Sequence, residues 1–123
     1  MQGFGALESA VMRLLWSRGT PATVREILTE LRSSRELAYT TVLTVMDNLY
    51  KKGWLTRQQD GRAHRYAPVV TREEYVAGAM REVLDSSGDR AQALLHFVGR
   101  MTLEDAAALR TALNTFERKI AGR

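Results

Sequence analysis

Apolar residues in the first fifty positions form three stripes with the spacing of an amphipathic helix. Gly19 and Pro21 end the first stripe, and the second follows a capping box between Thr23 and Glu26. Gly53 follows the third stripe. We therefore expect three helices, the second reaching to about residue 32. The stripes are Leu7, Val11, Leu14 and Leu15; Val24, Ile27, Leu28 and Leu31; and Val42, Val45, Met46 and Leu49.

A β-hairpin is expected directly after the third helix. Residues 54–59 and 62–67 flank Asp60-Gly61, a dipeptide that suits a two-residue type I′ turn, in which both central residues need a positive φ. This turn leaves Arg62 at the tip of the hairpin. The register that it predicts pairs Leu55 with Tyr66 and Arg57 with His64, on one face.

The rest of the chain carries helical patterns and no strand signal. Capping residues at Thr71 and Thr102 precede two longer helices, and a short helix is expected at about residues 90–98. We predict that the apolar side chains of the two longer helices form the interface of a homodimer, because a lobe below roughly 60 residues buries little surface alone. Burial of the last seam within its own lobe is the alternative. The dimerisation candidates are Val76, Met80, Val83, Leu84, Leu109, Leu113, Phe116 and Ile120.

The order of elements predicts a mainly α-helical fold with one small β-hairpin. Three helices followed by a two-stranded hairpin are typical of a winged helix-turn-helix, whose third helix enters the major groove of DNA. We expect this DNA-binding domain over residues 1–70 and a helical dimerisation domain over residues 71–123.

The net positive charge is concentrated where this fold would meet DNA. The chain has a formal net charge of +4. Residues 51–65 alone contribute +4, because their five basic side chains face a single acid, Asp60. A local basic excess of this kind favours a polyanion as the partner. The basic residues are Lys51, Lys52, Arg57, Arg62 and Arg65.

The third helix carries side chains suited to reading bases. Threonine hydroxyls can bond to base edges or phosphates, and the threonine methyl and leucine can pack on the thymine methyl group. These residues are Thr40, Thr41, Leu43 and Thr44. Asp47 does not fit beside phosphates, and we expect it to form an i,i+4 ion pair with Lys51.

Other functions find little support in the sequence. The chain has no cysteine and two histidines, so we expect no cofactor and no metal site. His64 is either a DNA contact or an ordinary strand residue, and His96 is expected to be a partly buried structural residue. No nucleophile motif or glycine-rich phosphate loop indicates an enzyme. No segment reaches the roughly 18 apolar residues of a transmembrane helix, so a cytoplasmic protein without a membrane partner is expected.

Residues 39–76 carry a more specific signal, YTTVLTVMDNLYKKGWLTRQQDGRAHRYAPVVTREEYV. This segment resembles the BlaI/MecI/CopY family of bacterial penicillinase-type repressors, and the resemblance extends from about Ala6 to the last helix. The resemblance implies a homodimeric repressor that binds double-stranded operators with TACA/TGTA-like half-sites. Because a dimer would meet successive half-sites, we expect it to compete with RNA polymerase and occlude promoters. The resemblance places Tyr39, Thr40, Thr41, Leu43 and Thr44 where the family reads DNA, and Arg57, Arg62 and Arg65 where its wing meets phosphate. Together with Lys51 and His64, these residues are the predicted DNA-binding set.

The sequence also departs from the family. The repressors of penicillinase and methicillin resistance are cleaved at an Asn-Phe bond, and the aligned pair here is Asp89-Arg90, so no inactivating protease follows from the sequence. The paired cysteines of the copper-responsive members are absent. Asn48 replaces a basic residue near the end of the third helix. A winged-helix module that binds protein or RNA is the alternative function.

Overall fold

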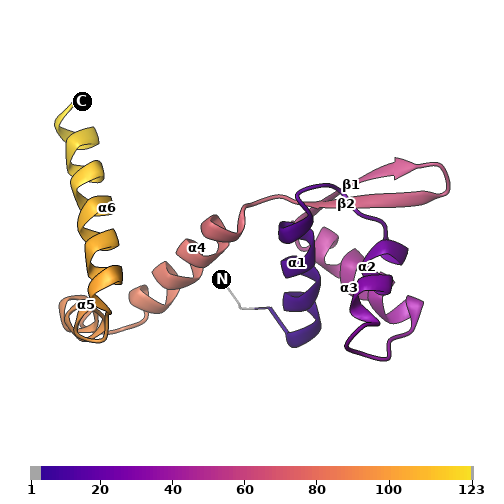
Figure 1. Cartoon of the computed structure of the whole chain (residues 1–123), viewed down its shortest axis with the longest axis horizontal. Helices are drawn as coiled ribbons and strands as arrows, with labels where there is room; N and C mark the ends of the chain where they lie inside the picture. The colour runs from indigo at the N-terminus through magenta and orange to yellow at the C-terminus, as the bar shows by residue number, and fades with distance from the viewer. Residues whose placement is uncertain (1–3, 123) are drawn as a thin grey trace. The chain divides into compact units, whose positions relative to one another are not determined.

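The computed structural model describes residues 4–122, which form six helices and one hairpin (Figure 1). The mainly helical fold and the order of elements expected from the sequence are confirmed. The elements are α1 (Ala6–Arg18), α2 (Val24–Leu31), α3 (Tyr39–Lys51), β1 (Leu55–Asp60), β2 (Ala63–Pro68), α4 (Arg72–Asp85), α5 (Arg90–Gly99) and α6 (Leu103–Ala121).

The chain divides into two compact units within α4. The first unit ends at Met80 and the second begins at Arg81. The sequence places the domain boundary at residue 70, before α4 begins, whereas the first turns of α4 belong to the first compact unit. The functional role of each domain stays a prediction.

The core of the first unit joins α1, α2 and α3 to the base of the hairpin. The predicted stripes supply most of its buried side chains, and Leu7, Leu14 and Val45 pack partly buried against it. The stripes arise because residues three and four apart lie on the same helix face. The buried residues are Ala10, Val11, Met12, Leu15, Ala22, Val24, Ile27, Leu28, Leu31, Val42, Met46, Leu49, Leu55 and Tyr66.

The register predicted for the hairpin is wrong by two residues. Arg57 lies opposite Tyr66, and Asp60 lies opposite Ala63, so the two-residue loop is Gly61-Arg62. Gly61 has a φ of 63°, and no other residue type among those described has a positive φ. This loop needs a left-handed conformation only at the glycine, whereas the predicted type I′ turn also required one at Asp60. Since the shift is two residues, every side chain keeps its predicted face.

The hairpin is attached to the helices through its second strand. Ala22, just before α2, exchanges two backbone hydrogen bonds with Tyr66, with N···O distances of 2.9 and 2.8 Å. Leu55 and Tyr66 share the face that turns toward the core, and both are buried. The base of the wing is therefore fixed, while its tip projects past the helices (Figure 1).

Four aromatic side chains attach the start of α4 to the first unit. Tyr75 lies against Phe4, Trp16 and Trp54, with ring centroids 4.4, 5.7 and 5.4 Å away. The Trp16 Nε1 donates a hydrogen bond to the Val70 carbonyl at 2.9 Å. The expected capping box opens the helix, since the Glu74 amide donates to the Thr71 hydroxyl at 3.0 Å and the Thr71 amide to the Glu74 carboxylate at 3.1 Å.

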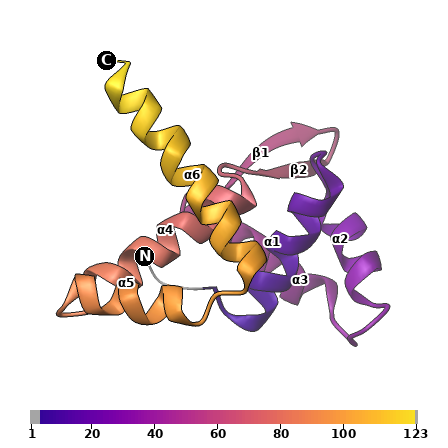
Figure 2. The same ribbon diagram turned by 60° about the vertical axis from the view of Figure 1, so that its left-hand side comes forward.

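The second unit consists of the end of α4 with α5 and α6. Its helices begin at side-chain caps, because the Gln92 amide donates to Asp89 and the Asp105 amide donates to Thr102. In two views α6 rises away from the end of α5 (Figures 1 and 2). None of the described residues of α4, α5 or α6 is buried. The expectation that His96 is partly buried is wrong for the single chain. His96 is exposed, and none of the described residues of α5 is buried.

Candidate nucleic-acid interface

The outer face of α3 presents the side chains that the sequence assigns to base reading. Thr40, Thr41 and Thr44 are exposed, and Leu43 retains 38% of its accessible surface. The opposite face buries Val42, Met46 and Leu49. Helical spacing thus fixes which side chains can reach a ligand, and burial of the apolar stripe holds them outward.

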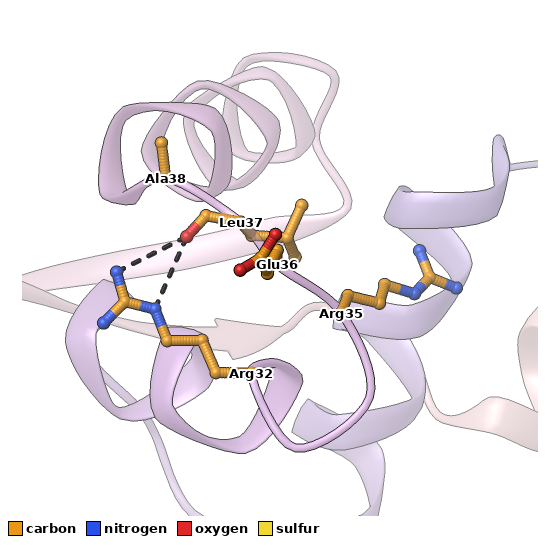
Figure 3. A pocket seen from close by; sticks show the side chains of 5 residues that line it. All are labelled: Arg32, Arg35, Glu36, Leu37 and Ala38. Carbon is orange, nitrogen blue, oxygen red and sulfur yellow. Dashed lines mark hydrogen bonds between the residues drawn. The ribbon is translucent and has the colours of Figure 1, made fainter.

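Cationic side chains that the sequence prediction missed lie near the N-terminal end of α3. Arg25 of α2 lies 5.1 Å from the centre of the Tyr39 ring. Arg32 and Arg35 line a shallow pocket beside Ala38, the residue that precedes α3 (Figure 3). Arg32 donates to the Leu37 carbonyl through Nε and Nη2, each at 3.4 Å. Basic and acidic residues balance over positions 1–50, so no charge excess in the sequence marks these arginines.

Asp47 connects α3 to the hairpin. Its Oδ2 pairs with Lys51 Nζ at 3.1 Å, which confirms the predicted i,i+4 ion pair. Its Oδ1 pairs with Arg57 Nη1 at 3.0 Å, a contact that the sequence did not reveal because it joins two elements. The hydrogen bond from Lys51, followed by the charges of Lys51 and Arg57, lowers the pKa of Asp47 despite some desolvation.

Arg57 is held from several sides. Its guanidinium lies 4.2 Å from the centre of the Tyr50 ring, in a cation–π contact. A hydrogen bond with Tyr66, its partner across the hairpin, is the main cause of a raised Arg57 pKa, with smaller contributions from Tyr50 and Asp47. Arg57 is therefore positioned before any ligand arrives.

Arg65 and Lys52 are also paired with acids. Arg65 donates to Asp60 at 2.7 Å and to Glu26 at 3.0 Å, and these contacts raise its pKa. Lys52 pairs with Glu8 at 3.0 Å. Arg62, at the exposed tip of the wing, forms no ion pair with any residue that the structure describes. Four of the five basic residues counted from the sequence thus have acidic partners, which offset part of their charge.

Glu26 joins the wing to two helices. Its carboxylate accepts from the Thr23 amide at 2.9 Å, which completes the predicted capping box of α2. The same carboxylate pairs with Arg65 of β2 and with Arg18 of α1. The Thr23 hydrogen bond is the first cause of a lowered Glu26 pKa, and both arginines add to it.

His64 is half-buried beside Tyr66, with ring centroids 6.4 Å apart. Its Nδ1 atom is enclosed by protein and has no hydrogen-bond partner. Nδ1 is therefore not placed to contact DNA, and any contact would have to come from the rest of the ring. The structure leaves both predictions for this residue open.

The predicted dimerisation residues lie largely exposed in the single chain. Val76, Met80, Val83, Leu113, Phe116 and Ile120 each keep at least 46% of their accessible surface, and Leu84 and Leu109 are half-buried. An exposed apolar surface on this scale normally marks an interaction site. The alternative, in which the last seam is buried within its own lobe, is not what the structure shows.

Within residues 4–122, no three His, Asp or Glu side chains are grouped so as to hold a metal ion. None of the helices in this range is long and apolar enough to cross a membrane.

Comparison with known proteins gives matches along most of the chain. The sequence profile of the penicillinase repressor family matches residues 4–115. The transcriptional regulator BlaI of Mycobacterium tuberculosis is 51% identical over 116 residues, which cover 92% of this chain and 84% of that protein.

Two solved structures share the fold. The DNA-binding domain of the repressor BlaI matches with a TM-score of 0.52 at 26% identity, covering 61% of this chain and 94% of that domain. Monomeric BlaI of Bacillus licheniformis, solved in complex with the blaP half-operator, matches with a TM-score of 0.50 at 26% identity, covering 60% of this chain and 89% of that chain. The winged-helix arrangement is therefore shared with a DNA-binding domain and with a protein solved on a half-operator.

Proposed function

The chain belongs to the penicillinase repressor family, and we propose that it binds palindromic operators with TACA/TGTA-like half-sites as a homodimer and blocks promoters by occupying them. It is a DNA-binding transcriptional repressor and not an enzyme. A relative solved on a half-operator favours DNA over the alternative of an RNA or protein ligand.

The exposed threonine face of α3 is the main support for sequence-specific DNA binding. Thr40, Thr41, Leu43 and Thr44 would face the base edges of the major groove, where hydroxyl and methyl groups can distinguish base pairs. Tyr39, beside Arg25, would lie where α3 enters the groove.

Basic side chains around α3 would supply contacts that do not depend on sequence. Arg62 is free to reach a phosphate from the wing tip. Lys51, Arg57 and Arg65 are held by acids, so each would approach a phosphate while keeping its acidic partner. Phosphate contacts of this kind fix register and orientation on the duplex.

Dimerisation would double this surface. We assign DNA binding to residues 1–70 and dimerisation to residues 71–123, where the exposed apolar side chains of α4 and α6 would be covered by a second copy. A twofold dimer meets two half-sites of a palindrome, so its geometry sets their spacing. The protein would act in the cytoplasm, where it competes with RNA polymerase for promoter DNA.

Transcription from a purified promoter tests the occlusion mechanism. A TACA/TGTA palindrome is placed across the polymerase site of one template and scrambled in a matched template. We expect the protein to suppress only the first transcript, because binding there excludes polymerase. Equal suppression of both transcripts, or of neither, would contradict the proposal.

A further inference from the structure

Asp47 lies on the same face of α3 as the base-reading threonines. It follows Thr44 by three residues and Thr40 by seven, spacings that place side chains on one side of a helix. Its side chain keeps 29% of its accessible surface. A carboxylate thus stands among the groups that would face the major groove.

This carboxylate is fixed in place and charged. Lys51 holds one oxygen and Arg57 holds the other, and Arg57 is itself held by Tyr50. Asp47 is ionised at neutral pH, as an aspartate normally is, and its lowered pKa favours the charged form further. An ionised carboxylate is an acceptor only, and its two oxygens offer about four lone-pair sites. Lone pairs therefore remain for a further donor.

The major groove offers donors at some base pairs and only acceptors at others. Cytosine presents its N4 amino group and adenine its N6 amino group, whereas guanine N7 and O6 and thymine O4 are acceptors. A fixed carboxylate gains a hydrogen bond from an amino group. Opposite an acceptor it is desolvated without compensation.

We propose that Asp47 is a specificity-determining residue that accepts a hydrogen bond from a base amino group, cytosine N4 or adenine N6, and rejects guanine and thymine at that place. The proposal rests on the proposed function, because it requires α3 to enter the major groove. Lys51 and Arg57 are positioning residues for this contact. They hold the carboxylate and offset its repulsion from the phosphates.

Selection from a library of duplexes with a randomised core tests the proposal without a known operator. Wild-type protein, Asp47→Ala and Asp47→Asn are each used to enrich bound sequences. We expect the wild type to enrich a palindromic motif with cytosine or adenine at one position of each half-site. Asp47→Ala should lose the preference at that position alone, by roughly tenfold, which is within the range for one good base contact. Asp47→Asn should shift the preference toward adenine, since an amide can pair with both N6 and N7.

Asp85→Asn provides the matched control. Asp85 forms an ion pair with Arg90 in the second unit, so this change removes one carboxylate charge from that unit and leaves α3 unchanged. The control should enrich the wild-type motif. If Asp47→Ala keeps the wild-type motif at every position, or weakens every position equally, the base-reading role is wrong. If the wild type enriches no motif, the proposed function itself fails, and the two failures are thereby distinguished.

Discussion

The Tyr75 ring stacks on Phe4, with ring centroids 4.4 Å apart and planes only 8° from parallel. This contact joins the first turn of α4 to the segment before α1, and Trp16 and Trp54 complete the aromatic cluster. The first turn of α4 is thus held against the winged helix by packing within the first unit.

We predict that Tyr75→Ala destabilises the first unit. Tyr75 is half-buried, so the loss should be about 1–3 kcal/mol, below the 3–5 kcal/mol typical of a fully buried aromatic residue. Urea unfolding of the full chain measures the change. Glu73→Ala, an exposed position in the same turn, is the control and should shift the midpoint little. Equal midpoints for the two variants would mean that the cluster contributes no stability.

Acid should weaken the connection between the wing and the helices. The pKa of Glu26 is lowered from its ordinary value of 4.5, first by the Thr23 hydrogen bond and then by Arg65 and Arg18. A lowered folded-state pKa gives stability that is present above the unfolded pKa and is lost as pH falls through the folded pKa. We therefore expect the free energy of unfolding to decrease as the pH drops below about 4.5.

Glu26→Gln isolates the part of this effect that comes from Glu26. Glutamine can still cap α2, because a capping box accepts either residue, but it carries no charge for Arg65. Unfolding followed from pH 7 to pH 3 should show a shallower loss of stability in this variant than in the wild type. Identical pH profiles would show that the ion pairs of Glu26 add nothing to stability.

Arg62 and Thr44 should affect DNA binding in different ways. Arg62→Ala should weaken binding to all sequences alike and reduce the slope of log K against log salt by about one per protomer, since one phosphate contact is lost. Thr44→Ala should leave the slope unchanged and reduce the preference for the operator. Titrations of labelled duplexes at several salt concentrations measure both quantities. Arg100→Ala, with the same charge change in the second unit, is the control for Arg62→Ala.

The whole interface should also respond to salt. If the dimer makes roughly 6 to 10 phosphate contacts, its affinity should fall by about 10³ to 10⁵ between 50 and 200 mM salt. The acids that pair with Lys51, Lys52, Arg57 and Arg65 favour the lower end of this range. A response independent of salt would exclude phosphate contacts as a main source of affinity.

Leu113→Asp should dissociate the dimer while leaving the winged helix folded. Leu113 is half exposed in the single chain, and a charge placed at this position would be buried without a partner in an α6 interface. Sedimentation should show a monomer, and operator affinity should fall sharply. Asn114→Asp adds the same charge at the next position of α6 and should leave the dimer intact. A Leu113→Asp dimer would refute the assignment of Leu113 to the interface.

The sequence predicted local structure well and contacts between elements poorly. The helical stripes, the capping boxes at Thr23 and Thr71 and the pair of Asp47 with Lys51 depend on neighbours within a few residues, and each is present. The prediction of the hairpin register was wrong because Asp60-Gly61 and Gly61-Arg62 both allow a two-residue loop. The contacts between the strands decide between the two loops.

The pairing of the basic residues could not be predicted for the same reason. Glu26 and Arg65 are far apart in the chain, and only the attachment of β2 beside α2 brings them within 3.0 Å. A count of charges along the sequence gave the location of the basic excess, but it did not show that most of these side chains already hold an acid. The contact of Arg57 with Asp47 was missed likewise.

If this chain reads operator sequence as a dimer through α3, it should bind a palindromic operator far more tightly than unrelated DNA of the same length. The most direct test is the ratio of its affinities for a TACA/TGTA palindrome and for a scrambled duplex of the same length and composition, measured by fluorescence anisotropy at physiological salt. We predict that the palindrome binds at least about 10³-fold more tightly, as is typical of specific DNA-binding proteins, and that Thr40→Ala combined with Thr44→Ala removes most of this ratio. Equal affinities of the wild-type protein for the two duplexes would show that α3 does not read these half-sites.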